Sequence, residues 1–532
     1  MEPEFNLLDE KWIRVRKEDC TVEELSLKEV FCHAHTCADL AGETPAQDVA
    51  MLRLLLAILH CVFSRVDEEG TESPLEEKSE VYPRWKALWD MGYFPERPIA
   101  EYLEKWRDRF WLFHETRPFW QVPQAAAGTE YDVSKLNGEI SESSNKLRLF
   151  SNRGGKEKLS LTYGEAARWL LYINGYDDTS AKPKKKGLES PGAGWLGKLG
   201  IIIAAGQNLF ETLLLNFTLL ADGSSLWDAQ NLAIWERETA PWEERTPIGC
   251  PDNQAALLTL QSRRLLLHRN TDKAIDGLCL LGGDFFSKEA ALTEQMTVWG
   301  RTSDKKNVTY QPKRHRPGTQ MWREFGAVFC AAEGSHLPGV VTWNRYLSKK
   351  MKKAERPYCI FKIISVQYGD KDFFVNDSFD DSLTFAAGML GDFDEDANTV
   401  WGIRVKEEVE KCEKLSRIVG DFAKDLLIAQ GGSTERSSAF QDAKEECFAR
   451  LDLPFRNWLY SIDPESRDKE MEDTILSWQE EAKKLVLELG KRMFENTDIS
   501  AFVGREKEKE KIYYSSPAAY EKMKRKVYGV YR

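Results

Sequence analysis

The sequence predicts an α+β protein, in which a large mixed α/β domain (residues 1–380) precedes a four-helix bundle (residues 381–532). Its 532 residues exceed what one hydrophobic core usually holds, which favours at least two domains. A hydrophobic fraction of 42% and a mean hydropathy of -0.49 are typical of a folded chain. After about residue 380 glycine and proline thin out and apolar residues follow a helical spacing.

The N-terminal region predicts a hairpin followed by a buried helix. Residues 5–15 alternate apolar and polar side chains around a polar turn, which is typical of two paired strands. Thr44 can cap a helix, Pro45 suits its first position, and Gln47 can complete a capping box. The helix that follows, over 48–63, is apolar on most faces, so we expect it at the centre of the N-terminal core.

The middle of the chain alternates predicted helices and strands. Helices are predicted over 163–172 and 208–220, and a strand over 201–203. Residues 358–366 predict a second strand, with 373–375 as its hairpin partner. In the last third, four helices with short links predict an antiparallel bundle, near 398–429, 436–461, 469–495 and 516–527.

Charge is unevenly distributed. The net charge of -12 argues against a protein that grips nucleic acid over its whole surface. Residues 301–356, however, hold 13 Lys and Arg against 4 Asp and Glu. A basic island on an acidic body fits a subunit that contacts nucleic acid locally and protein elsewhere.

No pattern assembles a catalytic or metal site. The chain has no Walker A, G-x-S-x-G or H-E-x-x-H sequence, and we predict no cofactor. Cys32, His33, His35 and Cys37 lack the second ligand pair that zinc sites usually draw from another loop, so buried thiols are favoured over a metal site. Ten cysteines without a C-x-x-C pair, and no apolar run as long as a membrane span, predict a reduced, cytoplasmic, soluble protein.

A glycine-rich segment is the first nucleic-acid signal. Gly192-Ala193-Gly194 carries almost no side-chain bulk, so its backbone can approach a ligand closely. A minor groove only ~6 Å wide admits such a thin loop but excludes a helix. An ordinary surface loop is the alternative interpretation.

Two further turns carry weaker signals. Lys305 and Lys306, and the run 313–316, lie on predicted basic turns that can reach phosphates, although solvated faces explain them equally. The turn of the predicted hairpin, Gly369-Asp370-Lys371-Asp372, can act as a wedge in a duplex or simply be a tight turn.

Several segments, taken in order, resemble one family. The chain is similar to the CasA-type large subunit of the type I-E CRISPR surveillance complex, Cascade. The segments that carry the resemblance are residues 5–15, 40–63, 117–122, 195–198 and 208–216, together with the helical last third. They span nearly the whole chain, and their order is more specific than any single motif.

This resemblance implies recognition of DNA rather than catalysis. In the family, three elements read the protospacer-adjacent motif from the minor-groove side. A glycine loop matches Gly192, Ala193 and Gly194, and a lysine finger matches Lys305 or Lys306. A wedge hairpin matches Gly369, Asp370, Lys371 and Asp372, where the family often has glutamine. A loop that docks the 5′ end of the guide RNA is matched most closely by Phe150 and Asn152.

The implied partners are the other Cascade subunits, the guide RNA, double-stranded target DNA and a helicase–nuclease, with no membrane. Motif binding would nucleate unwinding, and pairing with the guide RNA would carry sequence specificity. Two alternatives stay open. A metal- or nucleotide-dependent enzyme with an unrecognised site predicts turnover by the isolated protein, and a purely structural scaffold predicts no effect of the basic turns on DNA binding.

Overall fold

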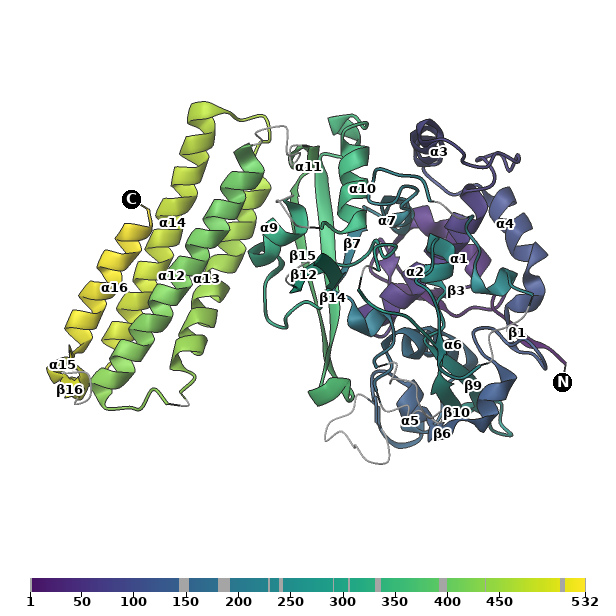
Figure 1. The fold of residues 1–532 in the computed structure, drawn as a ribbon, viewed down its shortest axis with the longest axis horizontal. Helices are drawn as coiled ribbons and strands as arrows, with labels where there is room; N and C mark the ends of the chain where they lie inside the picture. Colours follow the sequence, from purple (N-terminus) through teal and green to yellow (C-terminus); the bar gives the residue numbers. More distant parts are fainter. Residues whose placement is uncertain are drawn as a thin grey trace. The chain divides into compact units, whose positions relative to one another are not determined.

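The chain folds into two compact units, each described here by itself (Figure 1). Unit 1 comprises Met1–Thr319, Ala332–Met351 and Ile360–Ser382, and unit 2 comprises Gln320–Ala331, Lys352–Cys359 and Leu383–Arg532. The computed structural model describes residues 2–142, 153–179, 192–227, 230–238, 243–289, 291–304, 307–330, 336–391, 400–435, 437–507 and 512–531. Unit 1 mixes helices and strands and unit 2 is mainly helical, which is the predicted fold class.

The core of unit 1 is built around α2 (Pro45–Phe63), which is buried along almost its whole length. This is the one helix in the described ranges that is long and apolar enough to cross a membrane, but 94% of its apolar window is buried inside the protein, as in a core helix. Thr44 caps it as predicted, its hydroxyl accepting from the Gln47 N–H at 3.3 Å. The predicted capping box is wrong in detail, because Gln47 Oε1 accepts from the Glu43 N–H at 3.1 Å.

The predicted hairpin over residues 5–15 is wrong, because its two strands join different sheets. β1 (Glu4–Asn6) pairs with β5 (Trp111–Phe113), whereas β2 (Ile13–Lys17) lies between β3 (Val22–Leu25) and β4 (Cys37–Leu40). The Trp12 indole N–H donates to the Leu7 carbonyl at 2.9 Å within the core. Because Trp12 is buried, the chain after the turn does not fold back onto β1 as it would in a simple hairpin.

The second predicted hairpin is present and positions the candidate site. β14 (Tyr358–Tyr368) lies between β15 (Val375–Ala386) and β7 (Ile201–Ala205) in one three-stranded sheet. β14 and β7 are antiparallel, with Ile364 opposite Ile201. The turn between β14 and β15 is the predicted 369–372 tip.

The remaining elements of unit 1 surround this core. A second three-stranded sheet has the order β6-β10-β9, and β12 pairs with β13 in an antiparallel hairpin. The strands are β6 (Thr129–Asp132), β8 (Thr246–Pro247), β9 (Arg263–Arg269), β10 (Ile275–Gly282), β11 (Asp284–Phe285), β12 (Trp299–Asp304) and β13 (Asn307–Pro312). The helices are α1 (Leu27–His33), α3 (Lys78–Met91), α4 (Glu96–Lys105), α5 (Val133–Leu136), α6 (Tyr163–Tyr176), α7 (Leu209–Asn216), α8 (Gln254–Leu258) and α10 (Gly339–Ser348).

Helix α7 ends four residues earlier than the sequence predicts. Asn216 is locked to strand β7, because its side-chain amide donates to the Ala204 carbonyl at 2.6 Å and accepts from the Ala204 N–H at 3.0 Å. The chain therefore leaves the helix at Phe217.

Four long helices of unit 2 run side by side, drawn green to yellow in Figure 1. They agree with the predicted helices to within a few residues, and Trp458 of one stacks on Trp478 of another at 5.6 Å. Trp322, from a stretch ahead of residue 380, stacks on Phe455 at 4.3 Å, which explains why Gln320–Ala331 belongs to this unit. The elements are α9 (Phe325–Phe329), α11 (Gly388–Gly391), α12 (Val400–Gln430), α13 (Ala439–Ser461), α14 (Asp468–Glu495), α15 (Ile499–Val503), α16 (Ser516–Val530), β16 (Arg505–Lys507) and β17 (Ile512–Tyr514).

Candidate nucleic-acid interface

The predicted glycine loop is held tightly against helix α6. Ala193 is 2% exposed, and the Gly194 N–H donates to the Asp177 carbonyl at 2.9 Å. A Cβ on Gly194 would lie 2.3 Å from the Gly175 carbonyl oxygen, so packing alone requires glycine there. Gly192 differs, because it is only half-buried and adopts a φ of +67°. Of the three predicted residues, Gly192 is therefore the least buried.

A buried cluster of charged side chains contacts this loop. Arg263 pairs with Asp177 at 2.5 Å and donates to the carbonyls of Asp178 and Gly192, each at 2.8 Å. Lys135 contacts the carboxylates of both aspartates, at 2.7 Å from Asp177 and 3.1 Å from Asp178. Removing one of these side chains would leave the others as poorly compensated buried charges, which is costly. The cluster therefore keeps its arrangement and holds the loop rigidly.

The predicted wedge is a tight turn with strained backbone. Lys371 and Asp372 adopt φ values of 55° and 58°, in the left-handed region that non-glycine residues rarely occupy. Asp370 and Lys371 are exposed at the tip, and Gly369 closes the turn by donating its N–H to the Phe374 carbonyl at 3.0 Å. Such strain persists only where surrounding contacts fix the backbone.

Those contacts come from the chain that leads towards the glycine loop. Thr179 donates its N–H to the Asp372 carbonyl at 3.2 Å and its hydroxyl to the Lys371 carbonyl at 3.2 Å. The Phe374 N–H donates to Asp178 Oδ2 at 3.1 Å. Asp177, in the same short stretch, accepts from the Gly194 N–H of the glycine loop. Residues 177–179 therefore contact both predicted elements.

Arg314 ties the tip to Gly197, which follows the glycine loop in the sequence. Its guanidinium forms a bidentate pair with Asp372, at 2.6 and 3.0 Å, and donates to the Gly197 carbonyl at 2.6 Å. It also lies 4.8 Å from the centre of the Tyr368 ring. His315 is 5% exposed and its Nε2 lies 2.9 Å from the Ile201 carbonyl. The prediction that the turn over 313–316 presents these two side chains to phosphates is therefore wrong, because both make structural contacts.

Phe373 is a further candidate residue, which the sequence predicted only as part of a strand. Its side chain is 43% exposed beside the tip, and its ring packs edge-on against Phe374 at 4.8 Å. An exposed aromatic side chain on a rigid turn is the kind of group that inserts between base steps. The signal in the sequence was the Phe-Phe pair at the end of the predicted turn.

Four predicted residues lie outside the described part of the chain. Lys305 and Lys306 fall between β12 and β13, which pair up to Asp304 and Asn307. Phe150 and Asn152 fall within the undescribed stretch 143–152. Their assignments stay predictions. Across the described ranges no group of three or more His, Cys, Asp or Glu side chains is arranged to hold a metal ion.

Lys198 lies beside this interface and is sensitive to pH. Its burial, together with the positive charges of Arg263, Lys288 and Arg314, lowers the pKa of Lys198 to about 8. A Cβ on Gly192 would lie 3.8 Å from its Cε, which places Lys198 next to the accessible glycine.

The pKa of Lys198 predicts a measurable effect on stability. Its folded-state pKa is below the value near 10.4 of a free lysine, so between pH 8 and 10 the unfolded chain binds more protons than the folded chain. The free energy of unfolding of the wild type should therefore rise with pH relative to that of Lys198→Met, by about 1–3 kcal/mol. Urea unfolding of both proteins at pH 7, 8.5 and 10 measures this difference. Parallel pH profiles would contradict the assignment.

Comparison with known proteins identifies the family of the chain. The family model for CRISPR-associated protein Cse1 matches residues 6–489. The chain belongs to the Cse1 family. The curated CasA/Cse1 protein of Thermus thermophilus is 33% identical over 238 residues, which are 44% of each chain. The match to that relative thus spans less than half of its length.

Solved Cse1 structures resemble the chain along nearly its full length. Cse1 of Thermobifida fusca is 27% identical, with a TM-score of 0.81 over 99% of this chain and 98% of that one. Cse1 of Acidimicrobium ferrooxidans, at 23% identity and a TM-score of 0.77 over 99% of both chains, shows the shared fold. A chain of a CRISPR RNA-guided surveillance complex, at 17% identity, has a TM-score of 0.70 over 99% of this chain and all of that one.

Proposed function

We propose that this Cse1 protein is the large subunit of an RNA-guided surveillance complex in the cytoplasm. In this proposal it recognises a protospacer-adjacent motif in double-stranded DNA, starts local unwinding and R-loop formation, and helps recruit a helicase–nuclease in antiviral defence. The observation that carries the proposal is the joint anchoring of the glycine loop and the hairpin tip on the short stretch 177–179. Family membership and the fold shared with a surveillance-complex chain support it.

The proposed chemistry is recognition followed by strand separation. The Gly192 backbone enters the minor groove, where a side chain would not fit. Lys305 or Lys306 reaches the groove from the turn between β12 and β13. A rigid support matters because a loop that must be ordered on binding loses affinity to conformational entropy.

The hairpin tip acts at the first base pair beside the motif. Opening that pair costs a few kcal/mol of unstacking, which an inserted apolar side chain partly offsets. We assign this insertion to the exposed ring of Phe373, with Lys371 attracting a strand phosphate. Asp372 is neutralised by Arg314 and does not repel the strand as an isolated carboxylate would. Pairing with the guide RNA, docked near Phe150 and Asn152, would then extend the opening.

The basic turn gives the direct test of DNA reading. Alanine at both Lys305 and Lys306 should weaken binding of motif-bearing duplex by ~1–3 kcal/mol if a lysine reads the groove. A role limited to phosphates would weaken binding of all duplexes and lower the salt slope by about 1 per residue. Titration of the assembled complex on matched and motif-less duplexes separates the two roles. No loss on either duplex rejects both and favours a purely structural subunit, and metal- or nucleotide-dependent turnover by the isolated chain would favour the enzyme alternative.

A further inference from the structure

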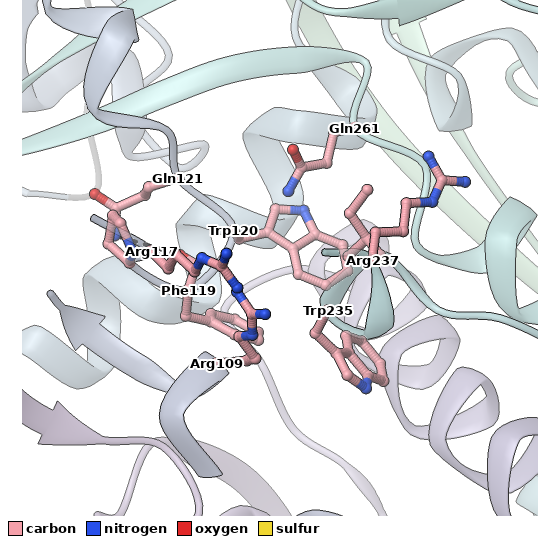
Figure 2. A pocket seen from close by; sticks show the side chains of 10 residues that line it. Arg109, Arg117, Phe119, Trp120, Gln121, Trp235, Arg237 and Gln261 are labelled. Atoms are coloured by element: carbon pink, nitrogen blue, oxygen red, sulfur yellow. Dashed lines mark hydrogen bonds between the residues drawn. The ribbon is translucent and has the colours of Figure 1, made fainter. Parts of the chain in front are cut away.

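A recess in unit 1 is lined by arginine and aromatic side chains. Its cavity of about 50 Å³ has ten lining residues, among them three arginines and no acid. A single water needs about 10–15 Å³ of such space, so the recess has room for a small polyatomic group. Figure 2 shows the guanidinium groups of Arg109 and Arg117 near each other beside the Phe119 and Trp120 rings, whereas the guanidinium of Arg237 points away from them.

The floor of the recess is rigid. The Phe119 N–H donates to the Trp111 carbonyl at 2.7 Å. The buried Gln121 amide donates to the Leu112 carbonyl at 2.8 Å and accepts from the Leu267 N–H at 2.9 Å. Trp120, between them, is held at a φ of +59°, which is a strained conformation for a bulky side chain. The segment 117–122 therefore presents its aromatic rings in one fixed arrangement.

None of the residues that line this recess is an acid that could balance its positive charge. Across the described ranges, Arg109, Arg117 and Arg237 form no ion pair with a carboxylate. Glu236, which precedes Arg237 in the sequence, is already paired with Arg65 at 2.7 Å and accepts from the Tyr102 hydroxyl at 3.0 Å. Two adjacent guanidinium groups repel each other unless an anion lies between them. The recess thus has the charge and the donors of an anion site.

The number of donors identifies the anion. One guanidinium fork already satisfies both oxygens of a carboxylate, whereas Arg109 and Arg117 present two forks. A phosphate group offers more acceptor oxygens and suits this pair. Trp120 and Trp235 are only 8% and 5% exposed, so they offer little ring face for stacking a base. A flexible single strand bends a phosphate into a recess far more readily than a duplex, whose persistence length is about 50 nm.

We propose that the recess formed by Arg109, Arg117 and the rings of Phe119 and Trp120 binds a backbone phosphate of a single-stranded nucleic acid. The site shares none of its ten lining residues with the glycine loop or the hairpin tip. It requires no motif, so a failure of this proposal leaves the duplex interface untouched, and the reverse also holds.

Fluorescence anisotropy of the full-length chain tests this site. The probes are a fluorescein-labelled 12-nucleotide RNA and the DNA of the same sequence. The variant Arg109→Ala/Arg117→Ala should bind at least about tenfold more weakly at 0.1 M salt, because it removes two charge-assisted hydrogen-bonding groups. Its slope of log affinity against log salt should also be shallower by about 0.7 for each phosphate that is no longer neutralised. The control Arg16→Ala/Arg97→Ala removes the same charge from exposed positions elsewhere in unit 1 and should bind as the wild type does.

Every outcome of this experiment bears on the proposal. If the double variant loses equal affinity for RNA and DNA, the recess binds the phosphate that both strands share. If it loses affinity for only one of them, that strand is the ligand. Either result supports the proposal. Inorganic pyrophosphate should compete with the wild type but not with the double variant. Unchanged affinity in the double variant, an equal loss in the control, or no binding by the wild type would overturn it. Competition by a poly-aspartate peptide but not by pyrophosphate would also overturn it, in favour of a protein carboxylate.

Discussion

Gly194→Val is expected to destabilise unit 1 by roughly 3 kcal/mol or more and to abolish duplex binding with it. The new Cβ would meet the Gly175 carbonyl oxygen at 2.3 Å and the Asn174 carbonyl oxygen at 2.9 Å, and neither backbone atom can move without shifting helix α6. Urea unfolding of the full-length chain measures the loss. A stability within about 1 kcal/mol of the wild type would contradict this packing.

Gly192 separates the effect on DNA from the effect on folding. Among the described residues, a Cβ there meets no atom closer than Lys198 Cε at 3.8 Å, and asparagine tolerates the positive φ that valine does not. Gly192→Asn should therefore fold with nearly wild-type stability but bind motif-bearing duplex at least about tenfold more weakly, because its side chain fills the groove. Wild-type binding by this variant would remove Gly192 from the interface.

Replacing the hairpin tip with a two-residue turn is expected to give the second large effect. Motif-dependent docking should stay largely intact, whereas strand opening should slow at least about tenfold, since the unstacking cost of a few kcal/mol is no longer offset. Fluorescence of 2-aminopurine at the first protospacer position of the target duplex reports opening by the assembled complex.

Single substitutions assign the effect within the tip. Phe373→Ala should slow opening by removing the inserted ring, and Lys371→Ala should slow it more than Asp370→Ala does. Arg314→Ala breaks the pair with Asp372 without shortening the turn, so it tests whether anchoring matters. Opening at the wild-type rate in the shortened protein would show that this hairpin is not the wedge.

Local sequence signals predicted the elements whose stability is local. The helices of the last third, the cap at Thr44 and the strand at 358–366 all follow from capping residues and apolar spacing within one segment. The N-terminal hairpin failed because Trp12 is buried against residues distant in sequence, and a polar turn cannot reveal that.

The candidate site shows the same division. The sequence identified the glycine loop and the tip, but not that the stretch 177–179 contacts both, because those contacts join residues up to 196 positions apart. Nor could it show that Gly194 serves packing while Gly192 faces outward, since both glycines look alike in the sequence. The arginine recess was equally hidden, because its walls come from residues 109–121, 234–237 and 261.

A gel-shift titration of the assembled complex on two duplexes that differ only in the candidate motif tests the central claim most directly. The complex is prepared with the wild-type chain, with Gly192→Asn and with the control Arg16→Ala. The account predicts a clear preference for the motif-bearing duplex in the wild type and the control, and loss of that preference in Gly192→Asn. Equal affinity of the wild type for both duplexes, or an undiminished preference in Gly192→Asn, would contradict it.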